Sequence, residues 1–267
     1  MSTRRAFVFA LAAAPTTVLA LRSSTATAET PSAIGVVLMH GKWGNPDKGI
    51  EPVELSLKGA GCPVLSREMP WSDRRAYDAG FDATMALLDA EVAQLKTQGA
   101  RKIVVGGHSF GANIALGYAA RHPELDGVMA LGPGHTPERF ASMPKMAESL
   151  TKARSLVAAG RGGQFANFND VNQGRSREVS ARPADYLSFF DPDGPAVMPR
   201  NAAMLSPHTA LLWVVGTRDN MYAAGRSYAF DRAPGNPHSS YQTVEADHLG
   251  TPAAARQIVV EWVKGLT

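Results

Sequence analysis

The chain has 267 residues, of which 45% are hydrophobic, so it is long enough to bury one sizeable core. Its 27 basic and 24 acidic residues give a formal net charge of +3, but three arginines lie within the first 28 residues and the remainder balances at 24 against 24. This balance, without a basic stripe, excludes the electrostatic signature of a nucleic-acid-binding protein.

The first 28 residues have the pattern of a secretory signal peptide. Two arginines precede an uncharged run at residues 6–21, and a stretch of small residues then ends at Ala28. The uncharged run is shorter than the roughly 20 residues that a spanning helix needs, and Pro15 interrupts it. Residues 3–8 also resemble a twin-arginine export signal. We therefore expect cleavage after Ala28 and export to the periplasm or the extracellular space, by the twin-arginine or another route, with no stable membrane insertion of the mature chain.

Short apolar runs alternate with helical patterns from Ile34 onward. Continuous apolar strands, rather than strands of alternating polarity, are typical of a parallel sheet that is covered on both faces. Strands that alternate with helices indicate a doubly wound, mostly parallel α/β sheet, whose ligand crevice lies at the carboxyl ends of the strands. About six strands are expected, at residues 34–39, 63–66, 102–106, 125–131, 210–215 and 241–245, with helices at 79–98, 111–121 and 252–266.

Residues 136–206 break this alternation, because they contain no clear strand. An apparent loop of this length inside a compact domain is usually either a functional lid or a sign that secondary-structure elements have been missed. We therefore expect a cap insertion at 136–206 within a single α/β domain at 29–267. The insertion contains a helical piece, a glycine-rich turn and an aromatic segment, at residues 144–159, 160–163 and 186–192.

The strongest chemical signal lies between the third expected strand and the helix that follows it. A nucleophile elbow needs small residues two positions before and after its serine, because the strand-to-helix turn is tight and holds the hydroxyl clear of the sheet. Backbone N–H groups at the start of the helix can bind an oxyanion. We therefore predict Ser109 as the nucleophile and the N–H of Phe110 as an oxyanion donor, with an ordinary glycine-rich turn as the competing interpretation. The motif reads Gly107-His108-Ser109-Phe110-Gly111.

A serine hydroxyl needs a base to take its proton near neutral pH, and His248 is the best-placed histidine. It follows the strand expected at 241–245 after two residues, so it lies at the same sheet edge as the nucleophile. His238 and His208 precede strands and therefore lie at the opposite edge, while His122 ends a helix and fits a partner of the helix dipole. We predict His248 as the general base, with a structural histidine as the alternative.

The third member of such a site is a carboxylate that fixes the tautomer of the histidine. Asp219 follows the strand at 210–215 and therefore also lies at a carboxyl end. Asp247 is adjacent to His248, but neighbouring side chains on an extended loop diverge, and a turn or a helix cap is the expected role of Asp247. We predict Asp219 as the acid.

A second oxyanion donor is expected from the glycine-containing loop after the first strand. This loop begins with His40-Gly41 and continues into Lys42 and Trp43. The peptide N–H of Lys42 is our candidate, with that of Trp43 as the nearby alternative and a chance His-Gly dipeptide as the competing interpretation.

Aromatic residues near the expected mouth of the crevice are candidates for an apolar substrate pocket. We select Trp43, Phe190 and Tyr222, each of which has a place in the hydrophobic core as its alternative.

These motifs, in this order, resemble the α/β-hydrolase superfamily, which includes small carboxylesterases and dienelactone-hydrolase-like proteins. The resemblance implies acyl transfer on a small-molecule ester through a Ser-His-Asp triad and an acyl-enzyme, with no metal or organic cofactor. A serine nucleophile counts against dienelactone hydrolase itself, which uses cysteine. Thioesterases, peptidases and surface-bound lipases share the triad, and a non-catalytic binding protein of the same fold is a further alternative. The resemblance is carried by residues 40–41, 107–111, 216–219 and 247–252.

Overall fold

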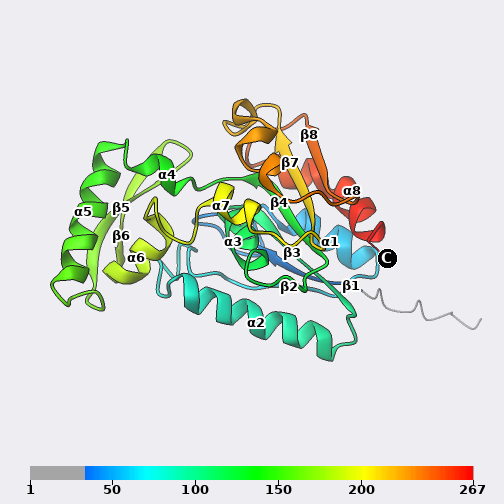
Figure 1. The fold of residues 1–267 in the computed structure, drawn as a ribbon, viewed down its shortest axis with the longest axis horizontal. Coiled ribbons are helices and arrows are strands. Elements are labelled where there is room, and N and C mark those ends of the chain that lie inside the picture. Colours follow the sequence, from blue (N-terminus) through cyan, green and yellow to red (C-terminus); the bar gives the residue numbers. More distant parts are fainter. Residues whose placement is uncertain (1–33, 267) are drawn as a thin grey trace, which may run out of the picture. The chain divides into compact units, whose positions relative to one another are not determined.

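The computed structural model describes residues 34–266 (Figure 1). The predicted signal peptide and its cleavage after Ala28 lie outside the described residues. Among residues 34–266, no helix is both long and apolar enough to span a bilayer.

A six-stranded parallel sheet forms the centre of the described chain, which confirms the predicted doubly wound α/β fold. The strand order is β2-β1-β3-β4-β7-β8, so the chain runs outward from β1 on one side and then returns to build the other side. The loops after β1 and β3 therefore diverge, and such a switch point is where α/β sheets bind ligands. The strands are β1 (Ile34–Met39), β2 (Val64–Ser66), β3 (Lys102–Ser109), β4 (Gly127–Pro133), β7 (Ala210–Gly216) and β8 (Ser240–Val244).

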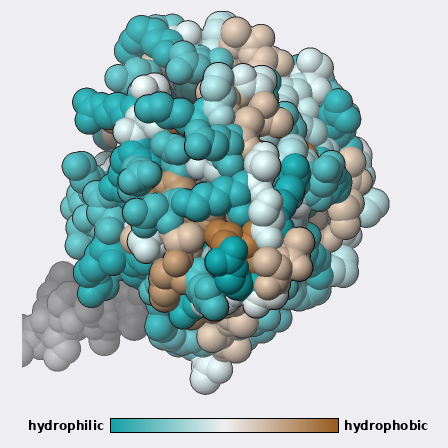
Figure 2. Space-filling view, turned by 90° about the vertical axis from the view of Figure 1, so that its left-hand side faces the viewer, coloured by the Kyte–Doolittle hydropathy of each residue, from teal (hydrophilic) through white to brown (hydrophobic). Residues whose placement is uncertain are grey.

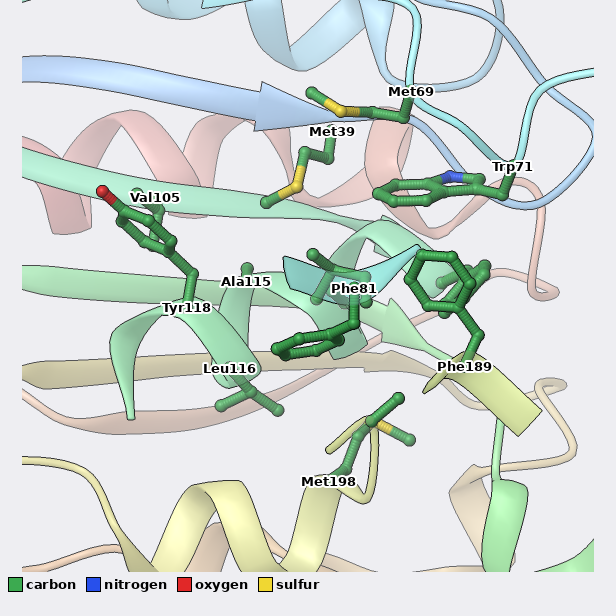
Figure 3. Packing of buried hydrophobic residues seen from close by; sticks show 14 of the residues in the cluster. Met39, Met69, Trp71, Phe81, Val105, Ala115, Leu116, Tyr118, Phe189 and Met198 are labelled. Carbon is green, nitrogen blue, oxygen red and sulfur yellow. The ribbon is translucent and has the colours of Figure 1, made fainter. Parts of the chain in front are cut away.

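Helices cover both faces of the sheet, as continuous apolar strands require. α1 (Glu51–Gly59) and α8 (Thr251–Lys264) pack on one face, against alternate strand residues such as Val36 and Val104. α2 (Phe81–Thr97) and α3 (Phe110–Ala119) pack on the other face, against Val37 and Val105. Figure 3 shows part of this second cluster, in which the helices and the sheet share one apolar layer.

Most of the chain between β4 and β7, residues 137–190, gathers at one end of the sheet (Figure 1) and presents a mostly hydrophilic outer face (Figure 2), whereas residues 198–203 pack against α3. We call this segment, residues 137–203, the cap. It contains helices packed on an antiparallel hairpin, and its aromatic side chains join the core cluster of α2 and α3. The elements are α4 (Pro137–Phe140), α5 (Pro144–Ala158), β5 (Ala166–Asn172), β6 (Arg175–Ala181), α6 (Pro183–Phe190) and α7 (Met198–Ala203).

The hairpin β5–β6 corrects the expectation that this region contains no strand. Phe168 and Asp170 face inward and are buried, whereas Asn167 before them is exposed and the intervening Asn169 is part-buried, so the strand does alternate. The pattern was hidden because an aspartate occupies one of the inward positions, where an apolar residue is the usual signal. Gln173 and Gly174 both have positive φ, as a two-residue turn of the type I′ class requires.

Candidate active site

Ser109 sits at the turn between β3 and α3. Its φ of 55° lies in the left-handed region, which is a strained position for a residue with a side chain. A Cβ on Gly107 would lie 2.6 Å from the Met39 carbonyl oxygen, and a Cβ on Gly111 would lie 2.5 Å from the same atom. Glycine is therefore required at both positions, because the turn passes directly against the end of β1.

The structure brings Ser109, His248 and Asp219 together at the carboxyl edge of the sheet. The Ser109 hydroxyl lies 2.9 Å from His248 Nε2, and His248 Nδ1 lies 2.7 Å from Asp219 Oδ2. With the imidazole proton on Nδ1, the serine donates to Nε2 and Nδ1–H donates to the carboxylate. The backbone N–H of Met221 donates to the other oxygen of Asp219 at 2.9 Å. All three residues are buried, with no more than 6% of their surface exposed.

The rival residues lie elsewhere. Asp247 Oδ1 accepts the N–H of Gly250 at 2.7 Å, which is the turn role expected from the sequence. His122 stacks on Tyr118, with the ring centroids 3.9 Å apart. His208 and His238 are exposed, on the loops that lead into β7 and β8.

His108 holds the backbone of His248 in place through a hydrogen bond, a role that the sequence did not predict. Its Nε2–H donates to the carbonyl oxygen of His248 at 2.9 Å, and the two rings lie 4.9 Å apart. Burial, reinforced by the nearby His248, lowers the pKa of His108 to about 3. The ring is therefore neutral near pH 7 and orients His248 without adding a charge. Its position next to the nucleophile was the available signal.

The loop after β1 passes beside Ser109. A Cβ on Gly41 would lie 3.2 Å from the Cβ of Ser109. The N–H of Trp43 donates to the Trp71 carbonyl oxygen at 2.9 Å, so this alternative oxyanion donor is already engaged. Within residues 34–266 the N–H of Lys42 has no hydrogen-bond acceptor, and the N–H of Phe110 lies in the first turn of α3, where no intrahelical partner exists. Both predicted donors are thus free to bind an anion.

Two hollows open beside Ser109. The first, of about 260 Å³, is lined in part by Phe140, Met143, Val171 and Met221, and we call it the apolar hollow. The second, of about 370 Å³, has several charged side chains in its lining, and we call it the charged hollow. Its walls include Trp43, Lys48, Asp73, Arg175 and Arg177, while Lys42, Ser109, Asn172 and His248 border both hollows.

The three predicted pocket residues have different positions. Trp43 borders the charged hollow, where the guanidinium of Arg177 lies 4.1 Å from the centroid of its ring. Phe190 is fully buried, and its ring centroid lies 4.2 Å from that of Tyr186, on which it stacks. It belongs to the hydrophobic core and does not line a hollow among the described residues. Tyr222 is 45% exposed and, within residues 34–266, is not part of the lining of either hollow.

Gly134 keeps the space next to the Ser109 hydroxyl open, a feature that the sequence did not predict. A Cβ at this position would lie 2.8 Å from Ser109 Oγ and 3.3 Å from His248 Cε1. The neighbouring His135 stacks on Phe110 with centroids 3.8 Å apart, and burial lowers its pKa well below the ordinary value. Its neutral ring forms a fixed wall of the apolar hollow.

The described residues contain no group of three or more His, Cys, Asp or Glu side chains placed to hold a metal ion.

Comparisons with known proteins agree on the fold. A family model described as "Alpha/beta hydrolase family" matches residues 36–261. The chain resembles a monoacylglycerol lipase of Paleococcus ferrophilus (TM-score 0.65, 20% identity, covering 89% of this chain and 96% of that one). It also resembles a thermostable carboxyl esterase of Bacillus coagulans (TM-score 0.63, 16% identity, covering 90% of this chain and 91% of that one). A thioesterase domain from the curacin biosynthetic pathway is similar as well (TM-score 0.51, 14% identity, covering 88% of this chain and 92% of that one). At these identities the likeness concerns the fold alone. No curated protein matches the sequence.

Proposed function

Because this chain belongs to the alpha/beta hydrolase family, we propose that it hydrolyses a carboxylic ester through Ser109, His248 and Asp219. The observation that carries the proposal is the buried relay from hydroxyl to imidazole to carboxylate, with distances of 2.9 and 2.7 Å. A serine, a base and an acid in hydrogen-bond contact are what nucleophilic acyl transfer needs.

The reaction would proceed in two halves. His248 Nε2 takes the proton of Ser109 as its oxygen attacks the ester carbonyl, and Asp219 stabilises the imidazolium that forms. The oxyanion of the tetrahedral intermediate binds the N–H groups of Phe110 and Lys42. His248 then protonates the leaving alcohol, and an acyl group remains on the serine. In the second half His248 activates a water molecule, which releases the acid and restores the hydroxyl.

The two hollows favour a small or medium-sized ester. Their volumes of about 260 and 370 Å³ lie near the lower end of ligand sites, and both border Ser109, so the acyl and alcohol parts would each occupy one. The likeness to a carboxyl esterase and a monoacylglycerol lipase supports an oxygen ester. A thioester is the second candidate, which the likeness to a thioesterase domain favours.

Removal of the nucleophile tests the proposal. A fluorophosphonate probe should label the wild-type protein stoichiometrically, and Ser109→Ala should abolish labelling and lower kcat/KM for p-nitrophenyl esters by about 10⁴-fold or more. Ser180→Ala, at an exposed serine of β6, is the matched control and should behave as wild type. Thioesters and amides of the same acyl group identify the preferred bond. Folded wild-type protein that takes up no probe would instead support a binding protein.

We also propose that the chain is exported and cleaved after Ala28, on the strength of its leader sequence. N-terminal sequencing of the protein recovered from the periplasm or the medium tests this, and an intact leader in the cytoplasm would contradict it.

A further inference from the structure

Asp170 is a fully buried carboxylate on β5, and most of its hydrogen-bond donors come from outside the cap. Its Oδ1 accepts from Lys42 Nζ at 2.6 Å and from the N–H of Val171 at 2.7 Å. Its Oδ2 accepts from the indole of Trp43 at 2.7 Å and from the hydroxyl of Tyr77 at 2.6 Å. Two of these four donors belong to the loop that carries the predicted oxyanion donor.

The peptide group between Gly41 and Lys42 has a fixed orientation. Its carbonyl oxygen accepts from the N–H of Gly44 at 3.2 Å and lies 2.8 Å from His40 Nδ1. His40 Nε2 accepts the N–H of Met69, so the proton is on Nδ1 and donates to the carbonyl. A trans peptide is planar, so its N–H points away from its carbonyl oxygen. The N–H of Lys42 is therefore held in one direction.

The next peptide group is held by the cap. The carbonyl oxygen of Lys42 accepts from Asn172 Nδ2 at 3.1 Å, while the N–H of Trp43 donates to Trp71. Lys42 Nζ also donates to the carbonyl oxygen of Val171 at 3.0 Å. Residues 170–172 of β5 thus hold both the main chain and the side chain of Lys42.

The backbone conformation of the loop at Lys42 and Trp43 is unfavourable without contacts from the rest of the protein. Trp43 has a φ of 57°, which a bulky residue rarely adopts and which persists only where surrounding contacts enforce it. The side chain of Lys42 is 3% exposed, and its ammonium lies 4.9 Å from the centroid of the Phe190 ring. Asp170 is the only ion-pair partner of Lys42 within residues 34–266. Without the carboxylate, a buried ammonium would be left uncompensated and the indole would lose its acceptor.

We propose that Asp170 is a positioning residue, which holds the Lys42 loop in its strained conformation so that the N–H of Lys42 can bind the oxyanion. The inference rests on the proposed function, because the oxyanion belongs to that reaction. It implies that the cap acts on catalysis itself as well as covering the site.

Asp170→Asn tests the inference, since asparagine has the same shape but leaves the Lys42 charge unpaired. The oxyanion forms only in the transition state, so kcat should fall about 10- to 100-fold while KM changes by no more than about threefold. The rate of fluorophosphonate labelling should fall by a similar factor, because the phosphonate oxygen uses the same donors. Glu178→Gln, an exposed carboxylate on the same hairpin, is the matched control and should leave kcat unchanged.

Hydrogen exchange separates the inference from the proposed function. The amides of Trp43 and Gly44 should exchange at least about tenfold faster in Asp170→Asn than in wild type, because their hydrogen bonds depend on the held loop. This result does not depend on which bond the protein cleaves. Amide exchange rates at Trp43 and Gly44 that match wild type in Asp170→Asn would overturn the inference. It would also be overturned if Asp170→Asn lost stability but the folded, probe-labelled fraction kept the wild-type kcat. An unlabelled wild-type protein would refute the proposed function instead.

A double variant covers the outcome in which Asp170→Asn does not fold. Lys42→Met together with Asp170→Asn removes the unpaired charge and keeps the stem of the side chain, so stability should recover. The turnover number should stay low, since the loop still lacks the carboxylate. Recovery of kcat along with stability would show that Asp170 matters only for folding and would overturn the inference.

Discussion

Ser109, Asp219 and His248 come from the carboxyl ends of parallel strands, whereas Lys42 is held by a hairpin that lies about 130 residues further along the chain. On the sheet side of the site, the topology alone brings the side chains to one edge. On the cap side, the position of the Lys42 loop depends on a few buried polar contacts. One candidate active site thus combines a part positioned by the backbone of the sheet with a part positioned by side-chain hydrogen bonds.

The largest effect is expected on the sheet side, where Asp219→Asn should lower kcat by about 10⁴-fold. The amide keeps the shape but favours the wrong tautomer of His248, so Nε2 can no longer accept the serine proton. Asp247→Asn is the matched control, because this carboxylate only receives the N–H of Gly250. Steady-state kinetics on a p-nitrophenyl ester would measure both. A near-normal rate in Asp219→Asn would transfer the role of the acid to another group.

A methyl group added beside Ser109 tests how rigid the sheet side of the site is, because a rigid backbone cannot move to relieve the clash. Gly134→Ala places a methyl group 2.8 Å from Ser109 Oγ, and kcat/KM should fall about 10- to 100-fold. Gly163→Ala, in the cap, is the control, since no atom of the described residues lies within 4 Å of its added methyl group. If both variants kept wild-type rates, the sheet side would be more pliable than its packing implies.

The smallest expected effect is on folding stability and concerns Glu91, a second buried carboxylate. Unlike Asp170, Glu91 lacks hydrogen-bond donors among the described residues. Glu91 on α2 is 1% exposed, and neither of its oxygens accepts a hydrogen bond from any of the described residues. Arg67 Nε approaches to 3.0 Å, but the contact does not meet hydrogen-bond geometry. Burial raises the pKa of Glu91 to about 7 from an ordinary 4.5, which the nearby Arg67 only partly offsets.

This raised pKa has a definite sign for stability. Between pH 4.5 and about 7 the unfolded chain ionises Glu91 while the folded chain keeps it protonated, so stability falls as pH rises through this window. Glu91→Gln removes the loss and should stabilise the fold by about 1–3 kcal/mol at pH 8, with little change at pH 4.5 and none in kcat. Urea unfolding at both pH values measures it, with the exposed Glu148→Gln as control. Equal stabilities at pH 8 would contradict the expectation.

The sequence predicts the sheet side better than the cap side, for a physical reason. Continuous apolar strands and a glycine-flanked serine are local patterns, and all six strands begin within two residues of their expected starts. Asp170 and Gly134 have no local pattern, because their roles depend on what the fold brings against them. Phe190 shows the same limit, since an aromatic residue near a crevice and one in the core look alike in sequence.

The hairpin β5–β6 divides its contacts along its length. Residues 170–172 hold the loop of Lys42, and Val171 and Asn172 also border the apolar hollow together with Gln173 and Gly174 at the turn. Within residues 34–266, Asp170 borders neither hollow. A longer or bulkier turn would therefore change the space beside Ser109 while the Asp170 carboxylate, three residues before the turn, stayed in place. Under the proposed function, substrate range and oxyanion support would be separable within one short hairpin, and residues 173 and 174 would be the place to redesign selectivity.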